Sequence, residues 1–329
     1  MKRALINTLR DFTGRTAKRW NERPAGLYCF NFHRVGNDDG SAFHPNLYSC
    51  TGRRFQEIIH FLKTEFTLVR ISDVVDLVEH GRRPSERLAL ITFDDGYIDN
   101  YTTAYPVLRS EGCPAVFFVQ TDFIDGIDIP WWDRIAWCIW HSGDVELRLP
   151  GVDTSLSVQG PRNELSIRKV LRAVKDTRGS SMEEKVRAIE LQTGCAAPSG
   201  AGRLAMTWDH VRQLRQDGMG IGSHTRSHRI LAHLSVSEQL LELESSKRIL
   251  ESRSGADIQS LAYPVGGFSS YSDETRSLAR QCGYRIAFNY EHAVNVDPSR
   301  IPFDLRRLPV EGNPSIDALR RMVAYAANA

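Results

Sequence analysis

The sequence predicts an α/β fold with a central parallel sheet, and three observations support this prediction. First, short apolar runs of the kind that form buried strands alternate with segments of helical spacing, which is typical of successive βα units. Second, 329 residues are enough for one α/β barrel with insertions. Third, a chain that is 41% hydrophobic and carries a net charge of +2 is not mainly disordered.

Short apolar runs mark the expected strands at seven places, and helical patterns lie between them. The runs are residues 26–32, 88–93, 115–119, 219–223, 260–263, 284–288 and 305–310. Ser72 is expected to cap a helix that stops at Gly81, and Asp209 is a candidate cap for a helix that Gly218 stops. A further helix begins after Ser235, which forms a capping box with Glu238 three residues later.

One region interrupts this alternation, at residues 141–206. It contains a segment of alternating polarity at 145–149, a Gly/Pro turn and two polar helical stretches. We interpret this region as an insertion that caps the barrel. The barrel itself is expected to span residues 25–312, followed by a C-terminal helix at 313–329.

The charge balance, 42 basic against 40 acidic residues, gives no reason to expect a nucleic-acid partner. Residues 1–24 are an exception, because seven basic and two acidic side chains give this segment a charge of +5. Leu5, Leu9, Phe12 and Trp20 share one helical face there. This pattern favours either contact with an anionic membrane surface or a terminal helix docked on the barrel.

Cellular location is predicted from the same end of the chain. No long apolar stretch follows the first basic residues, so we expect no signal peptide. The six cysteines show no C-x-x-C pair, and we expect them to be reduced thiols in the cytoplasm. If the amphipathic segment binds lipid, the protein would lie peripherally on the inner membrane face.

Two adjacent carboxylates, Asp94 and Asp95, follow the expected strand 88–93. They are either turn residues or active-site groups, because α/β barrels place catalytic residues at the carboxyl ends of their strands. Successive side chains at a strand end point in different directions, so one acid could bind a metal while the other acts as a base.

Two histidines, His224 and His228, follow another expected strand at a spacing of four residues. They are either surface histidines or ligands for zinc or a related metal. One Asp with two His would leave coordination positions open, which is typical of catalytic sites rather than structural ones. A third cluster at 261–267 ends a strand with a Pro/Gly turn, which could aim a backbone N–H at a developing oxyanion.

Together these motifs resemble the polysaccharide deacetylases, the NodB-homology superfamily that forms carbohydrate esterase family four. The resemblance rests on TFDDG at 92–96, SHTRSH at 223–228 and AYPVG at 262–266, in this order, and extends over about residues 26–310. It implies a distorted (β/α) barrel, usually with seven strands, with the insertion between the first and second metal-site motifs. It also implies the removal of acetyl groups from N-acetylated sugars, or of O-acetyl groups in some branches.

The resemblance assigns roles to five residues, each by its place in a motif. Asp94 matches the catalytic base, and Asp95, His224 and His228 match the metal ligands. Tyr263 matches the residue whose main-chain N–H helps to form the oxyanion hole. The implied metal is Zn²⁺ most often, with Co²⁺, Ni²⁺ or Mn²⁺ as alternatives, and the implied attack is by metal-activated water.

The sequence departs from the family pattern at two places. The Leu-x-His motif that supplies the general acid is missing near the C-terminus, so His33 is the first candidate for this role and His292 the second. The alternative for His33 is a structural histidine. The arginine beside the third motif is also missing; Arg307 is either its substitute, keeping Asp94 ionised, or a surface arginine.

The tryptophans at 131, 132 and 208 are either core residues or a wall of the sugar site. The function that these features predict is metal-dependent removal of N-acetyl groups from a polysaccharide, a glycan precursor or a lipid-linked sugar. The alternatives are an O-acetylesterase or deformylase that uses the same site, and a non-catalytic glycan-binding relative. Retention of both Asp94 and the three metal-ligand candidates weighs against the last of these, since a binding module needs no base beside a metal.

Overall fold

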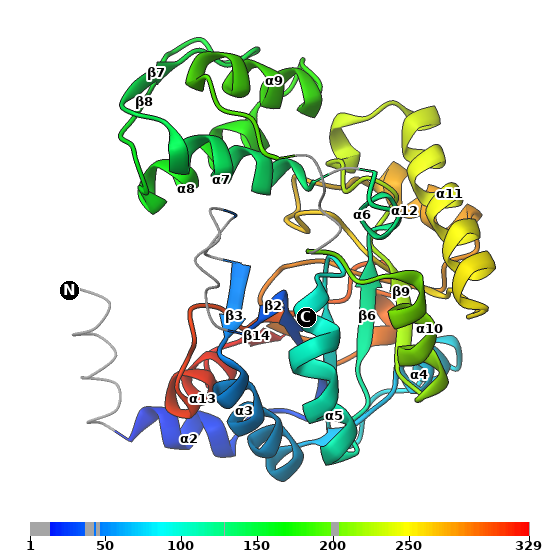
Figure 1. Cartoon of the computed structure of the whole chain (residues 1–329). Helices are drawn as coiled ribbons and strands as arrows, with labels where there is room; N and C mark the ends of the chain where they lie inside the picture. The colour runs from blue at the N-terminus through cyan, green and yellow to red at the C-terminus, as the bar shows by residue number, and fades with distance from the viewer. Residues whose placement is uncertain (1–13, 37–42, 44–46, 128, 199–203, 329) are drawn as a thin grey trace.

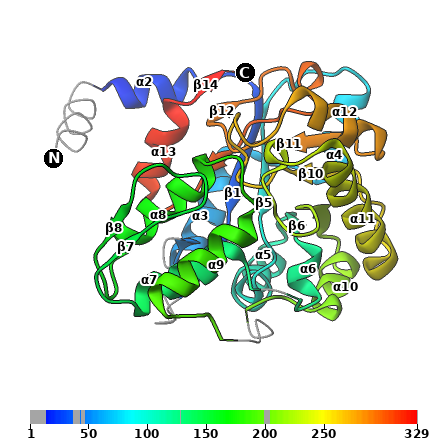
Figure 2. The same ribbon diagram turned by 90° about the horizontal axis from the view of Figure 1, so that it is seen from above.

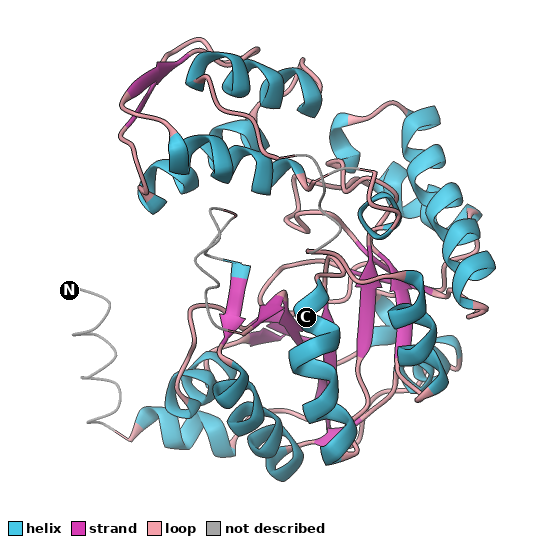
Figure 3. Cartoon of the chain, in the orientation of Figure 1, coloured by secondary structure: helices cyan, strands magenta, loops and turns pink. Residues whose placement is uncertain are grey.

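The computed structural model describes residues 14–36, 43, 47–127, 129–198 and 204–328. A curled sheet lies at the centre with helices around it, and a separate lobe stands over one end (Figures 1 and 3). Within the described residues, no helix combines the length and the apolar character needed to cross a lipid bilayer.

The sheet has seven strands in the order β11-β10-β9-β6-β5-β1-β13, and every pairing along this path is parallel. In chain order these strands are β1 (Gly26–Phe32), β5 (Arg87–Phe93), β6 (Val116–Val119), β9 (Gly220–Ser223), β10 (Ser260–Ala262), β11 (Ile286–Phe288) and β13 (Leu308–Pro309). They correspond to the seven predicted runs. A short eighth strand, β4 (Thr67–Leu68), pairs with β5 outside this path.

The chain that leads into β13 joins the two edges of the curled sheet. Leu305 pairs with Phe288 of β11, and Leu308 pairs with Phe30 of β1. One short segment therefore contacts both edge strands, which brings the sheet close to a closed cylinder. The predicted α/β class and distorted (β/α) barrel are confirmed.

The strands are buried on both faces, which explains why they appear in the sequence as continuous apolar runs. All seven residues of β1 are buried, and so are the four of β6. On the outer face of the sheet, under α3, the ring of Phe93 stacks against Phe117 with ring centroids 4.8 Å apart and against Phe32 at 5.4 Å, and it also contacts Phe55.

Helices cover the outside of the sheet. They are α3 (Gly52–Glu65), α4 (Ile71–Glu79), α5 (Tyr105–Glu111), α6 (Thr121–Ile124), α10 (Trp208–Gln216), α11 (Val236–Ser254), α12 (Asp273–Gln281) and α13 (Ile316–Ala324). Shorter elements are β2 (Arg34–Val35), β3 (Tyr48–Cys50), β12 (Ala293–Val294), β14 (Ala327–Asn328), the π-helical turn η2 (Asn100–Ala104), and the 3₁₀ turns η4 (Leu231–His233) and η5 (Pro298–Arg300). The amphipathic α3 shows why these helices form, because its buried side chains recur at helical spacing on one face.

The helix starts test the predicted caps. The capping box of Ser235 and Glu238 is confirmed, with each residue bonding to the backbone of the other. The prediction for Ser72 is wrong, since α4 begins at Ile71 and the carboxylate of Asp73 accepts the N–H of Arg70 at 2.8 Å. The prediction for Asp209 is also wrong, because the Thr207 hydroxyl caps α10.

The lobe has a hydrophobic core of its own. It consists of α7 (Trp131–His141), β7 (Val145–Leu147), β8 (Leu156–Val158), α8 (Glu164–Asp176) and α9 (Met182–Thr193). Figure 2 shows it lying across one end of the barrel. The expected insertion at 141–206 starts at the last residue of α7, whereas the lobe core already includes Trp131.

The N-terminal segment is described only from Gly14 onward. Its helix α2 (Arg15–Asn21) packs against the barrel through Trp20, whose ring centroid lies 5.6 Å from that of Phe61 and 6.2 Å from that of Phe66. Leu5, Leu9 and Phe12 lie outside the described residues, so contact of this segment with a membrane stays a prediction.

Candidate active site

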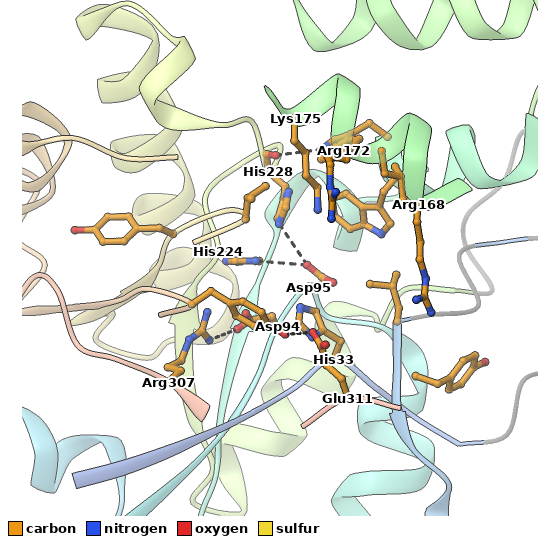
Figure 4. Close-up of a pocket in the computed structure, with 18 of the residues that line it drawn as sticks. His33, Asp94, Asp95, Arg168, Arg172, Lys175, His224, His228, Arg307 and Glu311 are labelled. Atoms are coloured by element: carbon orange, nitrogen blue, oxygen red, sulfur yellow. Dashed lines mark hydrogen bonds and ion pairs between the residues drawn. The ribbon is translucent and has the colours of Figure 1, made fainter. Parts of the chain in front are cut away.

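A pocket of about 810 Å³ opens where the carboxyl ends of the barrel strands face the lobe (Figure 4). This is the end of a βα barrel at which successive loops can bring side chains from different strands together. The pocket is lined from the barrel by His33, Asp94, Asp95, His224, His228, Tyr263, Val265, Tyr290, Arg307 and Glu311, among others. The structure thus brings together all seven residues predicted for the site.

Asp95, His224 and His228 meet on the floor of this pocket. The Nε2 atoms of His224 and His228 lie 3.5 and 3.6 Å from Oδ1 of Asp95. All three side chains are buried, and one ligand atom from each lies within 4.8 Å of the other two.

The donor set fits a divalent cation. Oδ1 of Asp95 is buried and accepts no hydrogen bond within the described residues, which is a costly state for an ionised oxygen. Two ligand atoms bound to zinc at 2.0–2.1 Å in tetrahedral geometry are about 3.4 Å apart, close to the two separations seen here. A cation would supply the missing partner of this oxygen, and the mixed N/O set suits zinc or a neighbouring transition metal.

The His224 imidazole is held so that a nitrogen lone pair faces Asp95. Nδ1 of His224 donates to the carbonyl of Ala262 at 2.8 Å, which leaves Nε2 without a proton in the neutral ring. Burial, reinforced by the nearby His224, lowers the pKa of His228 to about 3. The His228 ring is therefore suited to metal binding as a neutral ligand. Burial lowers the pKa of His224, but the carboxylates of Asp94 and Asp95 raise it overall.

The loop that carries both histidines is strained and is fixed from behind. Thr225 and His228 have positive φ angles of 63° and 55°, which side chains other than glycine rarely adopt. Glu242 of α11 is buried and accepts the N–H groups of Arg226 and Ser227 at 3.0 and 2.9 Å. This carboxylate replaces the hydrogen bonds that the loop cannot make within the sheet.

Asp94 occupies a different environment from its neighbour. Arg307, which is only 1% exposed, donates from NH1 to Oδ1 of Asp94 at 2.7 Å. Burial alone would raise the pKa of the Asp94 carboxyl, but Arg307 and His224 hold it well below its usual range. Asp94 is therefore ionised at neutral pH, and Arg307 is a buried partner rather than a surface residue.

Asn31 of β1 connects this ion pair to the sheet. Its Nδ2 donates to Oδ2 of Asp94 at 3.2 Å, and its Oδ1 accepts from Arg307 at 2.9 Å and from the Thr92 hydroxyl at 2.8 Å. Sequence analysis missed Asn31. The available signal was a polar residue one position before the end of the buried aromatic strand β1.

His33 lies on the pocket wall and is only partly buried. Its ring contacts Tyr290 edge-on, with centroids 5.8 Å apart, and the Tyr290 hydroxyl donates to the Glu311 carboxylate. Its position allows it to reach a bound substrate. The second candidate acid, His292, is exposed and is not among the residues that line the pocket, so the structure removes it from this role.

The predicted role of the Tyr263 main chain requires a correction. Its N–H donates to the carbonyl of Phe288 at 3.0 Å as part of the sheet, so it is not available to an oxyanion. Val265, two residues later, also lines the pocket and has a φ of 64°, which is strained for a β-branched residue. Among the described residues the Val265 N–H finds no acceptor, which makes it the better candidate.

The three tryptophans were expected to be either core residues or a wall of the sugar site, and they differ in position. Trp131 and Trp132 line the pocket, and the Trp132 ring lies 4.3 Å from that of His228. Trp208 does not line it, and its indole N–H donates to Asp125 at 2.7 Å.

Helix α8 of the lobe contributes residues that sequence analysis did not predict. Arg168, Arg172 and Lys175 line the pocket from above (Figure 4). Their spacing on a predicted polar helix was visible in the sequence. However, the expected cap did not specify which face of that helix meets the pocket.

Comparisons with known proteins point to one family. Residues 81–136 and 182–287 match the family model described as polysaccharide deacetylase. YxkH of Bacillus subtilis (strain 168), which is named as a member of the same family, is 23% identical over 271 residues; the match covers 82% of this chain and 66% of YxkH.

Two solved structures share the fold. The deacetylase PplD of Streptococcus pyogenes, solved with acetate, superposes with a TM-score of 0.60 at 17% identity, over 91% of this chain and 99% of PplD. A de-N-acetylase from Aggregatibacter actinomycetemcomitans gives 0.59 at 15% identity, over 90% of this chain and 99% of the other. The ordered motifs, the barrel and the family match agree that this chain belongs to the polysaccharide deacetylase family, whose members are carbohydrate deacetylases.

Proposed function

We propose that the protein is a zinc-dependent hydrolase that removes N-acetyl groups from a sugar in a glycan or glycan precursor. The observation that carries this proposal is the arrangement of the pocket floor. Asp95, His224 and His228 converge there with separations of 3.5–3.6 Å, beside the ionised, arginine-paired carboxylate of Asp94. Asp95, His224 and His228 are thus suited to hold a cation, and Asp94 is suited to act as a base.

The cation that Asp95, His224 and His228 would hold lowers the pKa of a water molecule to about 7 and polarises a carbonyl oxygen. Asp94 accepts the proton of the attacking water as general base. Arg307 and Asn31 keep this carboxylate ionised and fix its orientation.

The remaining residues act on the acetyl group and the leaving amine. The Val265 N–H donates to the oxygen that becomes negative as water adds to the carbonyl carbon. His33 then protonates the departing nitrogen when the C–N bond breaks, so that acetate and a free amino sugar are released.

Two observations favour an N-acetylated sugar as the substrate. An amide needs protonation of its leaving nitrogen, and His33 lies on the pocket wall where it could supply that proton. The similar structure from Aggregatibacter actinomycetemcomitans is named as a de-N-acetylase.

The test is acetate release from N-acetylated and O-acetylated sugars, with a formamido sugar as a third arm, by the zinc-loaded protein. We expect acetate from the N-acetyl substrates and much less from the Asp94→Asn variant. Release of formate alone, or hydrolysis of esters alone, would assign the site to another reaction. Binding of a glycan without any hydrolysis would show a non-catalytic relative.

A further inference from the structure

We propose that the sugar substrate carries a phosphate or pyrophosphate group, and that Arg168, Arg172 and Lys175 of α8 bind it. This inference rests on the proposed function and adds a substrate class to it. It comes from a part of the pocket that takes no part in the chemistry described above, since all three residues belong to the lobe.

The three cations form a row on one helix face. They stand at positions i, i+4 and i+7, which lie on the same side of an α-helix. At 1.5 Å per residue, the row is roughly 10 Å long. Figure 4 shows Arg172 and Lys175 pointing from α8 toward the floor that holds Asp95, with Arg168 at the side of the pocket.

Two of the three cations carry no ion pair. In the part of the chain that the structure describes, Arg172 and Lys175 form none, although the carboxylates of Asp95, Glu311 and Asp176 act on Lys175 electrostatically. The acids below have other partners: Asp94 pairs with Arg307, and Glu311 accepts from the Tyr290 hydroxyl. Asp95 faces the two histidines.

Lys175 lies deepest of the three. It is only partly exposed, its Nζ lies 5.9 Å from the centroid of the Trp131 ring, and burial lowers its pKa despite the nearby Asp95 and Glu311. A bound anion would compensate a partly desolvated ammonium group.

A phosphate fits this row better than a carboxylate does. Guanidinium groups bind phosphate oxygens with two parallel hydrogen bonds, and two of the three residues are arginines. A single carboxylate engages one guanidinium, whereas a pyrophosphate offers several anionic oxygens along the row. A phosphorylated N-acetyl sugar could thus place its acetamido group on the floor and its phosphates against α8.

The position of the row in the chain points to substrate selection rather than to the shared chemistry. Helix α8 lies between the two stretches that match the family model, 81–136 and 182–287, and belongs to neither. The reacting residues Asp94, Asp95, His224 and His228 all lie within those stretches.

The experiment compares four N-acetylated probes: methyl N-acetylglucosaminide, N-acetylglucosamine joined to glucuronic acid, UDP-N-acetylglucosamine, and a short polyprenyl-pyrophosphate N-acetylglucosamine. The zinc-loaded protein is compared with the triple variant Arg168→Gln, Arg172→Gln, Lys175→Gln. Lys169→Gln is the matched control, because Lys169 belongs to the same helix but does not line the pocket, and its Nζ donates to the Ser157 carbonyl.

We expect kcat/KM for at least one phosphorylated probe to exceed that of the methyl glycoside tenfold or more. The ratio of kcat/KM for the phosphorylated probe to kcat/KM for the methyl glycoside should fall at least tenfold in the triple variant. It should stay unchanged in Lys169→Gln. A preference for the nucleotide or for the lipid probe identifies the source of the phosphate. An equal ratio in the wild type and the triple variant would overturn the proposal, and so would an equal preference for the glucuronate probe.

A binding arm separates this inference from the proposed function. If no probe is deacetylated, the assignment of the reaction fails, but calorimetry with UDP-N-acetylglucosamine and the zinc-loaded Asp94→Asn protein still tests the cationic row. Binding that falls tenfold or more with the triple substitution, and weakens with added salt, supports it. The absence of binding to the protein with an intact row would reject it.

Discussion

At the scale of single residues, the neighbouring carboxylates Asp94 and Asp95 differ in what surrounds them. Asp94 has an arginine at 2.7 Å and an amide at 3.2 Å, whereas Oδ1 of Asp95 faces two imidazole nitrogens and receives no hydrogen bond among the described residues. The adjacent residues can thus take different roles because the chain turns sharply between them, with a φ of 77° at Asp95.

Replacement of each carboxylate should separate the two roles. Asp94→Asn keeps the three ligands, so we expect metal content after dialysis to stay near the wild-type value while kcat falls by roughly 10²–10⁴-fold. Asp95→Asn should lose metal at the same free concentration. Metal loss in Asp94→Asn, with normal turnover of the remaining loaded enzyme, would reverse the assignments.

Removal of Arg307 should change the pH dependence of catalysis. Arg307 lowers the pKa of Asp94, and the base acts when ionised, so Arg307→Met should raise that pKa and protonate the base at mildly acidic pH. The acidic limb of the kcat/KM profile should therefore move to higher pH, by roughly 1–3 units.

The neighbouring arginine provides the control for this change. Arg306 pairs with Asp304 at 2.9 Å and does not contact Asp94, so Arg306→Met should leave the limb in place. Similar shifts in both variants would show that the effect is structural. Because Asp94 loses a buried partner, we also expect the free energy of unfolding of Arg307→Met to fall by about 3–5 kcal/mol, measured with urea.

The sequence motifs identified which side chains form the site. They did not show where the backbone N–H groups of the site point. Asp94, Asp95, His224 and His228 were predicted because motifs show which groups occur at which spacing. The Tyr263 main chain was assigned incorrectly, because its hydrogen bond to the Phe288 carbonyl depends on which strand lies beside β10.

At the scale of elements, helix α11 positions the metal-ligand loop through one side chain. Glu242 accepts two backbone N–H groups and the Ser227 hydroxyl, and among the hydrogen bonds of the described residues none joins it to His224 or Asp95. Supporting groups of this kind typically change metal affinity 10–100-fold when they are removed.

Glu242→Ala should therefore weaken zinc binding about 10–100-fold, because it removes the oxygen that accepts both loop N–H groups. Competition with a chelator measures this affinity. Glu244→Ala is the control on the same helix, since Glu244 is exposed. Equal zinc affinities in the two variants would show that Glu242 does not fix the loop.

Strands and helices were predicted with different success for a physical reason. Parallel strands buried on both faces produce apolar runs, and so all seven were found. Helix starts depend on which of several polar side chains reaches the free N–H groups. Asp73 and Thr207 do so here, although Ser72 and Asp209 are also good capping types.

At the scale of the whole molecule, the lobe and the barrel are two cores that share one pocket. The lobe core contains side chains of α7, α8 and α9, and the barrel core contains those of the sheet and its outer helices. Sequence analysis predicted an inserted region that caps the barrel but not which of its side chains enter the pocket, since packing between segments distant in sequence leaves no local pattern.

Two matched core substitutions test whether the cores unfold separately. Ile189→Ala in the lobe and Ile58→Ala in the barrel each remove a fully buried side chain and should cost about 2–5 kcal/mol locally. Hydrogen exchange in Ile189→Ala should increase in α7–α9 and leave β1 and β5 protected. Equal acceleration in the barrel strands would show a single cooperative unit.

The central claim is that hydrolysis depends on a cation held by Asp95, His224 and His228, and metal titration tests it most directly. Chelator-stripped protein is titrated with Zn²⁺ while acetate release from an N-acetylated sugar is measured. We expect activity to rise with bound zinc and to level off at one equivalent, and we expect neither binding nor activity in His224→Ala. Undiminished acetate release from the stripped protein, or full activity of the stripped His224→Ala variant, would contradict the claim.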